Sequence, residues 1–185
     1  MNIVSETNLA QHYLKDVIIQ FEQTEKLGRL SIEQLNDEEI HHEFSEGSNS
    51  VSIIVKHICG NMKSRWADFL TTDGEKPDRN REDEFVDDID SKKQLLGIWE
   101  KGWKLLDVLK TLTENDLLKI ITIRNEEHTV VMAINRQLKH YAYHVGQIVL
   151  LAKAIKGDQW KSLSIPKGKS NEYIDKPFKD ESRKK

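Results

Sequence analysis

Apolar residues recur at helical spacing in four long segments of the sequence. The first segment covers about residues 6–26. Gly28 is expected to end this helix, because glycine readily adopts the left-handed backbone found just after helix C-termini. A short separate helical piece is expected at residues 31–35, since Ser31 and Gln34 have the spacing of a capping box. The N-terminal part of the chain therefore predicts one long helix and one short one.

Three further helices are expected over about residues 51–70, 91–112 and 129–156. Residues 48–50 offer capping side chains before the second of the four helices, and Gly157 is expected to end the last. Four long helices of this kind predict an all-α fold, a four-helix bundle of antiparallel type. Strand patterns are weak, and only residues 118–122 are expected to be extended.

The fourth helix is apolar around most of its circumference, so we expect it to be largely buried. Residues 71–90 are rich in acidic side chains and predict a long, solvated surface connection. One domain is expected over residues 1–170, followed by a basic, frayed tail at residues 171–185. Three apolar residues after the fourth helix are expected to pack on the bundle: Trp160, Leu163 and Ile165.

The composition narrows the classes of function. The net charge of −3 argues against non-specific electrostatic binding of nucleic acid, which needs clustered Lys and Arg. No apolar run approaches the ~20 residues that span a bilayer, and the first residues lack a signal-peptide pattern, so no membrane association is expected. Cys59 is the single cysteine and cannot form an internal disulfide. A cytoplasmic location is therefore expected.

Histidines suggest where chemistry takes place. His140 and His144 lie four residues apart, which places both imidazoles on the same side of a helix, one turn apart. His57 lies in another apolar helical segment and can supply a third ligand from a facing helix. Three neutral imidazoles with one open position describe a catalytic type of metal site, suited to zinc, nickel, iron or copper.

A plainer interpretation competes with this one. Two histidines at this spacing often mark only the side of a helix, and His57 alone is more typical of a hydrogen-bonded residue at the border of an apolar face. The metalloprotease pattern requires Glu directly after the first histidine, whereas Tyr141 stands there. Peptide hydrolysis by that scheme is therefore not supported.

The segment Asn135-Arg136-Gln137-Leu138-Lys139-His140-Tyr141-Ala142-Tyr143-His144-Val145-Gly146-Gln147-Ile148 resembles the last bundle helix of the DinB-like superfamily, whose common form is His-x-x-x-His-x-Gly-Gln. The stretch Ile54-Val55-Lys56-His57-Ile58 is similar to the second helix of that superfamily, which carries its other histidine. The tail at residues 162–170 further resembles one uncharacterised branch found mainly in bacilli, so the likeness covers about residues 5–170.

This resemblance implies a four-helix bundle that binds a divalent metal, usually zinc or nickel, through His57, His140 and His144. Relatives in that superfamily include bacillithiol transferases, other thiol transferases and metal-dependent hydrolases, and they are often homodimers. This branch has no settled activity, so the substrate does not carry over. The favoured hypothesis is an enzyme that transfers a small-molecule thiol to an electrophile, because the nearer relatives with known activity are thiol transferases. Hydrolysis is one alternative. The other is a bundle without enzymatic activity, in which the histidines hold a structural or sensed ion.

Other residues have weaker functional readings. Arg65 and Gln147 are weak candidates for substrate binding, although an ordinary surface arginine is the better interpretation of Arg65. No general base is identifiable, because no carboxylate follows either histidine of the last helix. Cys59 is expected to be an inert buried thiol, and Gly146 is expected to permit close helix packing. The remaining residues singled out are expected to serve as core aromatic residues or as surface and capping histidines: Trp66, Trp99, Trp103, His12, His41, His42 and His128.

Overall fold

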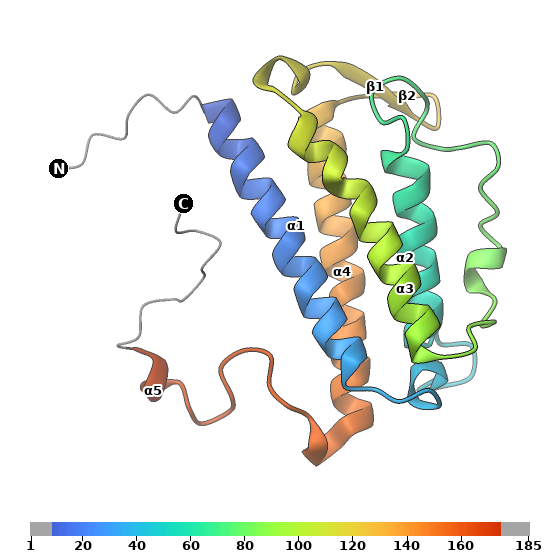
Figure 1. The fold of residues 1–185 in the computed structure, drawn as a ribbon, viewed down its shortest axis with the longest axis vertical. Coiled ribbons are helices and arrows are strands. Elements are labelled where there is room, and N and C mark those ends of the chain that lie inside the picture. The colour runs from blue at the N-terminus through green and yellow to red at the C-terminus, as the bar shows by residue number, and fades with distance from the viewer. Residues whose placement is uncertain (1–8, 175–185) are drawn as a thin grey trace.

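The computed structural model describes residues 9–174, in which four long helices form a bundle (Figure 1). They are α1 (Leu9–Glu33), α2 (Val51–Trp66), α3 (Lys92–Lys104) and α4 (Val130–Lys156). The remaining helices are short: η1 (Glu39–His41), η2 (Asp83–Phe85), η3 (Leu105–Thr111), η4 (Glu114–Asp116), η5 (Gly157–Gln159) and α5 (Asn171–Ile174). The predicted all-α four-helix bundle is confirmed.

The helices do not simply alternate in direction. α1 and α4 run one way along the bundle, and α2 and α3 run the other way (Figure 1). The connection of residues 67–91 makes this possible, because it returns along α2 to the end where α2 began (Figure 1). At one end of the bundle the Gly74 N–H donates to the Thr122 carbonyl at 2.8 Å. At the other end, Lys92 Nζ donates to the Leu35 carbonyl at 2.7 Å.

Three of the long helices begin at capping hydroxyls. The side chains of Ser50, Ser91 and Thr129 each accept a hydrogen bond from the backbone N–H three residues further on. These bonds satisfy N–H groups that have no partner inside the helix. Gly157 ends α4 with a positive φ of 51°, which glycine adopts without strain. The starts expected for the second and fourth helices and the end expected for the fourth are therefore confirmed.

The expected end of the first helix is wrong. α1 continues through Gly28 to Glu33, and Gly28 is buried within it. A Cβ at Gly28 would lie 2.4 Å from a ring atom of Trp99, so glycine is present there to let α3 approach α1. The separate short helix is also wrong, because Ser31 lies inside α1 and its hydroxyl donates to the Leu27 carbonyl at 2.9 Å.

Two other helix ends differ from expectation. α2 stops at Trp66 rather than near residue 70, and Asp68 just after it has a positive φ of 48°. The third helix is regular only to Lys104 and continues as the 3₁₀ helix η3. In both cases apolar residues continue in the sequence beyond the end of the α-helix. The apolar pattern therefore predicted helix ends several residues beyond the observed ones.

A two-stranded hairpin lies at one end of the bundle (Figure 1). Strand β1 (Ile120–Ile123) pairs antiparallel with β2 (Glu126–Thr129), so that Ile123 faces Glu126 across the turn. Arg124 and Asn125 form this turn with φ values of 57° and 61°, the positive pair that two-residue hairpin turns require. Only the first strand was expected, because β2 is polar and lacks an apolar alternation.

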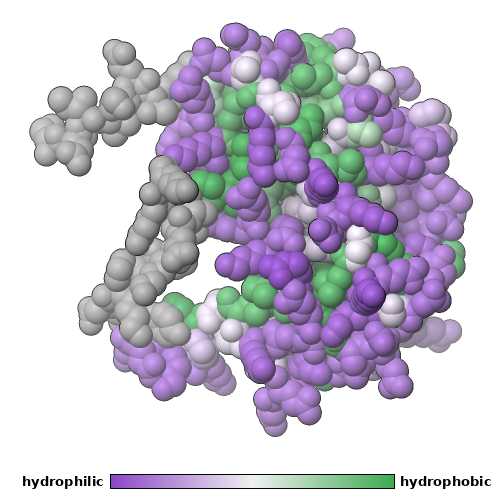
Figure 2. Space-filling model, in the orientation of Figure 1, coloured by the Kyte–Doolittle hydropathy of each residue, from purple (hydrophilic) through white to green (hydrophobic). Residues whose placement is uncertain are grey.

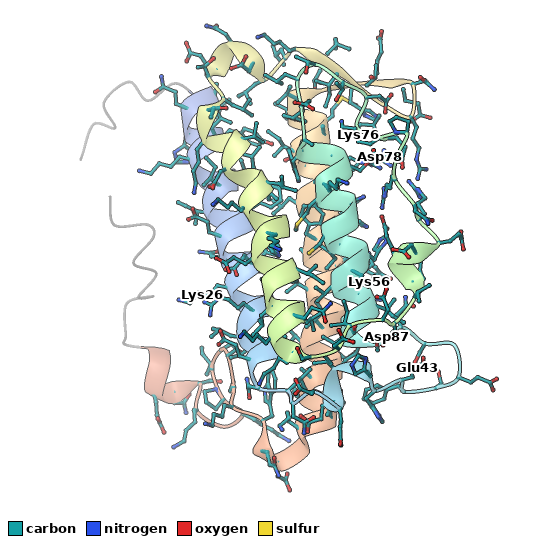
Figure 3. All side chains as sticks on the ribbon, turned by 45° about the vertical axis from the view of Figure 1, so that its right-hand side comes forward. Lys26, Glu43, Lys56, Lys76, Asp78 and Asp87 are labelled. Atoms are coloured by element: carbon teal, nitrogen blue, oxygen red, sulfur yellow. The ribbon has the colours of Figure 1, made fainter. Side chains whose placement is uncertain are left out.

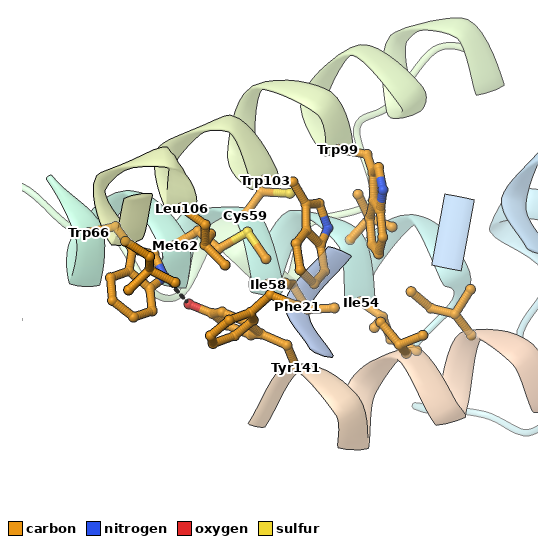
Figure 4. Close-up of a cluster of buried hydrophobic side chains, with 14 of the residues drawn as sticks. Phe21, Ile54, Ile58, Cys59, Met62, Trp66, Trp99, Trp103, Leu106 and Tyr141 are labelled. Atoms are coloured by element: carbon orange, nitrogen blue, oxygen red, sulfur yellow. Dashed lines mark hydrogen bonds between the residues drawn. The ribbon is translucent and has the colours of Figure 1, made fainter. Parts of the chain in front are cut away.

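The core fills the space between the four helices and contains all the tryptophans expected there. Trp66, Trp99 and Trp103 are buried with Phe21 and Tyr141 (Figure 4). Cys59 lies among them as a buried free thiol, and burial raises its pKa to about 12. Hydrophilic residues cover most of the face shown in Figure 2, with hydrophobic ones visible between them. Within residues 9–174, no helix is both long enough and apolar enough to cross a bilayer.

Helix α4 is buried on one side only, which corrects the expectation that most of it lies inside. Met132, Tyr143 and Leu150 are 53%, 62% and 68% exposed. Gly146 is also exposed, and a Cβ there would meet no heavy atom within 4 Å. Close helix packing at Gly146, a second expectation, is therefore wrong.

The segment after α4 packs on the bundle in part. Trp160 packs against the core, and the side chain of Gln34 exchanges two hydrogen bonds with the backbone of Lys161. Leu163 is half-buried, whereas Ile165 is 45% exposed, so the expected docking of Ile165 is wrong. The predicted frayed tail begins with the short helix α5, and residues 175–185 lie outside the described residues.

Candidate metal centre

Three histidines converge between α2 and α4. His57 comes from α2, His140 and His144 come from α4, and one ring nitrogen of each lies within 4.8 Å of the other two. The Nε2 atoms of His140 and His144 are 3.1 Å apart. Two nitrogens bound tetrahedrally to zinc at about 2.1 Å lie about 3.4 Å apart, so this pair already has the spacing of metal ligands. The histidines predicted from the sequence to share a site are thus brought together.

Tyr141 fixes α4 against α2 next to these rings. Its buried hydroxyl accepts a hydrogen bond from Trp66 Nε1 at 3.0 Å (Figure 4). It donates in turn to Asn61 Oδ1 at 3.1 Å. Because Trp66 and Asn61 both belong to α2, these two bonds hold the helices together one residue from His140.

The Nδ1 atoms of two of these rings are held by hydrogen bonds. His57 Nδ1 donates to Glu84 Oε2 at 3.0 Å, and His144 Nδ1 donates to Gln147 Oε1 at 2.8 Å. A proton on Nδ1 leaves the Nε2 lone pair free to face the common centre. Gln147, a weak candidate for substrate binding, therefore orients a candidate metal ligand.

Glu84 is a site residue that the sequence did not reveal. Its side chain is 8% exposed, and Arg79 donates to both of its carboxylate oxygens, at 2.7 and 2.9 Å. Burial by itself raises the pKa of Glu84, but hydrogen bonds from His57 and Arg79 outweigh it and hold that pKa below its usual value. Gly60 makes room for this carboxylate, because a Cβ there would lie 2.4 Å from Glu84 Oε1.

The connection between α2 and α3 lies at the surface, as expected, but part of it is buried against α2. It carries Glu84 and Arg79 into a buried ion pair and lies along α2 (Figure 3). Lys56 on α2 anchors it further, by donating to Asp88 Oδ1 at 2.5 Å and to the Val86 carbonyl at 2.8 Å. Most of residues 71–90 are exposed, so the predicted surface connection is confirmed. The expectation that its charged side chains are solvated is wrong for Glu84 and Arg79, which are buried against each other.

Burial favours the neutral form of the two α4 imidazoles, which is the form that binds a metal. Burial, followed by repulsion from the positive charge of neighbouring groups, lowers the pKa of His140 to about 3. Burial also lowers the pKa of His144, although its hydrogen bond with Gln147 opposes the shift. Both imidazoles therefore offer lone pairs at neutral pH.

The three-histidine group adjoins a cavity of about 1040 Å³, which His57 and His140 help to line. Among the described residues, the group contains no fourth His, Cys, Asp or Glu ligand. Phe85 stacks on the His57 ring with centroids 5.2 Å apart, and it is 46% exposed. An ion held by these rings would keep a position for a further ligand, as catalytic rather than structural sites do.

Arg65 also lines this cavity, and the expectation of an ordinary surface arginine is wrong. Its side chain is 4% exposed. The guanidinium donates to the Gly74 carbonyl, to Ser64 Oγ at 3.2 Å and to Glu75 Oε2 at 3.2 Å. Burial lowers the pKa of Arg65 against the opposing effect of Glu75, but its charge is retained because a guanidinium stays protonated in proteins.

Comparison with known proteins identifies a family. No curated protein matches the chain. No solved structure matches it either. The model of a protein family of unknown function, DUF1572, matches residues 8–169. This match takes in all four long helices and the three histidines. The chain therefore belongs to the DUF1572 family.

Proposed function

We propose that this protein is a metal-dependent thiol transferase of DinB-like type, with zinc or nickel held by His57, His140 and His144. The observation that carries the proposal is the convergence of three imidazoles beside a large cavity, with no fourth described side chain to complete the coordination. The motif His140-Tyr141-Ala142-Tyr143-His144-Val145-Gly146-Gln147 supports the DinB-like affiliation.

The donor set fits such an ion. Three imidazole nitrogens suit zinc and nickel, and the Nδ1 hydrogen bonds to Glu84 and Gln147 keep two of the rings oriented toward the centre. When bound, a divalent ion supplies a Lewis acid that lowers the pKa of a thiol or a water and so provides a nucleophile at neutral pH. Glu84 is occupied by His57 and Arg79, so it positions a ligand instead of accepting a proton from substrate.

The proposed reaction is substitution by sulfur. The thiol loses its proton to solvent, its sulfur forms a bond to an electrophilic carbon, and the leaving group departs with the electron pair of the broken bond. Water in place of the thiol gives hydrolysis of the same electrophile. The cavity favours either reaction over a purely structural ion, because a structural site needs no space for a small molecule.

Metal binding is the first test of this proposal. We expect the purified full-length protein to retain zinc or nickel after dialysis, at about one ion per chain by elemental analysis. His144→Ala should lose the ion but remain helical by circular dichroism. His12→Ala removes an exposed histidine of α1 and should retain it. A wild-type protein that retains neither metal contradicts the proposal.

Activity is the second test. Metal-loaded protein is incubated with a panel of low-molecular-weight thiols, bacillithiol and cysteine among them, and with 1-chloro-2,4-dinitrobenzene as the electrophile. We expect thioether formation that depends on the loaded metal and is absent in His144→Ala. Electrophile consumed without thiol would indicate hydrolysis. If a metal-loaded protein catalyses neither reaction across a broad panel of electrophiles, the non-enzymatic alternative is favoured.

A further inference from the structure

The cavity beside the metal centre has features that the three histidines do not explain. Its wall is built from α2, the connection that follows it, the hairpin and the first half of α4. At about 1040 Å³ it is as large as the pockets that take up small molecules, which run to about 1000 Å³. It is therefore large enough for a ligand that reaches the metal centre and also contacts the surrounding wall.

Several polar atoms of this wall have no partner. The described residues contain five buried side-chain nitrogen or oxygen atoms without a hydrogen bond, and three belong to residues lining this cavity. These are Nε of Arg65, Nε2 of His128 and Oε1 of Gln137. Arg65 and Gln137 are 4% and 2% exposed. Such atoms are rare in folded proteins because each is costly to bury unpaired. All three belong to side chains of the cavity wall, where a small rotation toward a polar ligand would give them a partner.

His128 was expected to serve at the surface or in a cap. Its side chain is instead 13% exposed, on the strand β2 beside the cavity. Its nearest carboxylate contact is the exposed Glu126, at 3.9 Å, which is too long for a hydrogen bond. The imidazole therefore adds a nitrogen to the wall that Arg65 and Gln137 also form.

The charge of the wall has one sign. Six cationic side chains line the cavity, and no carboxylate does: Arg65, Arg79, Arg81, Arg124, Arg136 and Lys139. Glu75 lies just behind the wall and contacts four of these arginines, at distances of 2.7 to 3.5 Å. Arg136 and Lys139 are exposed and form no ion pair with any residue in the described part of the chain. The wall therefore keeps an excess of positive charge facing the cavity.

We propose that this cavity binds the anionic group of a small organic substrate, a carboxylate or a phosphate, and so directs the reactive end of that molecule toward the metal centre. Arg65, Arg136 and His128 supply donors to the anion, and Gln137 accepts a hydrogen bond from a hydroxyl or amino group of the same molecule. The placement of the reactive end rests on the proposed function. Anion binding itself does not depend on it.

Calorimetric titration of the full-length protein tests this inference. Succinate and inorganic phosphate serve as anionic probes, and succinamide serves as an uncharged counterpart of succinate. Each titration is made at low ionic strength, with and without bound zinc, because an anion can also bind the ion itself. We expect at least one of the two anions to bind in both forms and succinamide to bind in neither. The preferred anion identifies the substrate as a carboxylate or a phosphate.

The variants avoid residues that hold the fold together. Arg136→Gln removes an exposed charge that has no partner among residues 9–174, and we expect it to weaken anion binding about tenfold. Gln137→Met keeps the length of a side chain that makes no hydrogen bond with the described residues, and therefore should not lower stability. Lys153→Gln is the matched control, because it removes an exposed charge of α4 outside the cavity. Arg65 is left unchanged because its guanidinium bonds the backbone of the connection.

Each outcome decides between the two proposals. Binding that is weakened by Arg136→Gln but not by Lys153→Gln supports the anion site, even in a protein that retains no metal and for which the proposed function fails. Binding that requires zinc and is unaffected by Arg136→Gln overturns the anion site and leaves the metal centre standing. Absence of binding up to about 10 mM of either anion also overturns it.

Discussion

Gly60 provides a sharp test of how the metal centre is supported. A methyl group at this position would lie 2.4 Å from Glu84 Oε1 and 2.7 Å from its Cδ. That carboxylate cannot move aside without breaking hydrogen bonds, because Arg79 donates to both of its oxygens and His57 to one of them. Gly60→Ala should therefore push Glu84 away from His57, although neither residue is itself changed.

The expected loss follows from the role of Glu84. Removing the hydrogen-bond partner of a ligand histidine typically weakens metal affinity by about 10- to 100-fold, which equals about 1.4–2.8 kcal/mol. Alanine would by itself stabilise the helix by about 1 kcal/mol relative to glycine. The crowding at Glu84 opposes that gain at a cost of about 1–3 kcal/mol. We therefore expect weaker zinc binding with little or no gain in stability.

Gly146→Ala is the matched control. It makes the same change in another helix, two residues from His144, where a Cβ meets no heavy atom within 4 Å. Zinc affinity is measured by competition with a chelator of known affinity, and stability by urea denaturation. Gly146→Ala should keep the wild-type affinity and gain about 1 kcal/mol of stability. Equal zinc affinities for the two variants would refute the claim that Glu84 orients His57.

Three further results are expected. Tyr141→Phe leaves the buried Trp66 and Asn61 groups without their partner, so urea denaturation should show a loss of about 1–3 kcal/mol; an unchanged midpoint contradicts this. Cys59 should react with a thiol reagent at pH 8 only after unfolding, since burial raises its pKa to about 12; rapid labelling of folded protein would refute this. Burial raises the pKa of Glu75, but hydrogen bonds from nearby arginines outweigh it and hold that pKa at about 2. The stabilisation by ionised Glu75 should be complete above pH ~4.5 and lost as pH falls toward 2. The melting temperature of the wild-type protein should therefore fall over this pH range, and that of Glu75→Gln should fall less.

The helices were predictable where local chemistry determines their ends. α4 begins after Thr129 and ends before Gly157 because a capping hydroxyl and a glycine with positive φ act within one turn of the chain. The same rule wrongly predicted that the first helix ends at Gly28. This glycine instead lies inside α1 and leaves space for the ring of Trp99 from α3. The apolar pattern of either segment alone does not indicate that α1 and α3 make this contact.

The site was predictable to the extent that it follows helical spacing. His140 and His144 share one side of α4 by their separation alone. The apolar helical segment around His57 made it a candidate third ligand, and the resemblance supported that choice. Glu84, Arg79 and His128 come from polar segments without periodicity, so their burial could not be inferred. Alternating opposite charges within residues 75–84 are the one signal that could have indicated a buried network there.

Anomalous diffraction from zinc-loaded crystals can locate an ion held by the three imidazoles. We expect one strong anomalous peak per chain, with the Nε2 atoms of His57, His140 and His144 each about 2.0–2.1 Å from it. A peak bound elsewhere, or one contacting only the two histidines of α4 with His57 turned away, would contradict it.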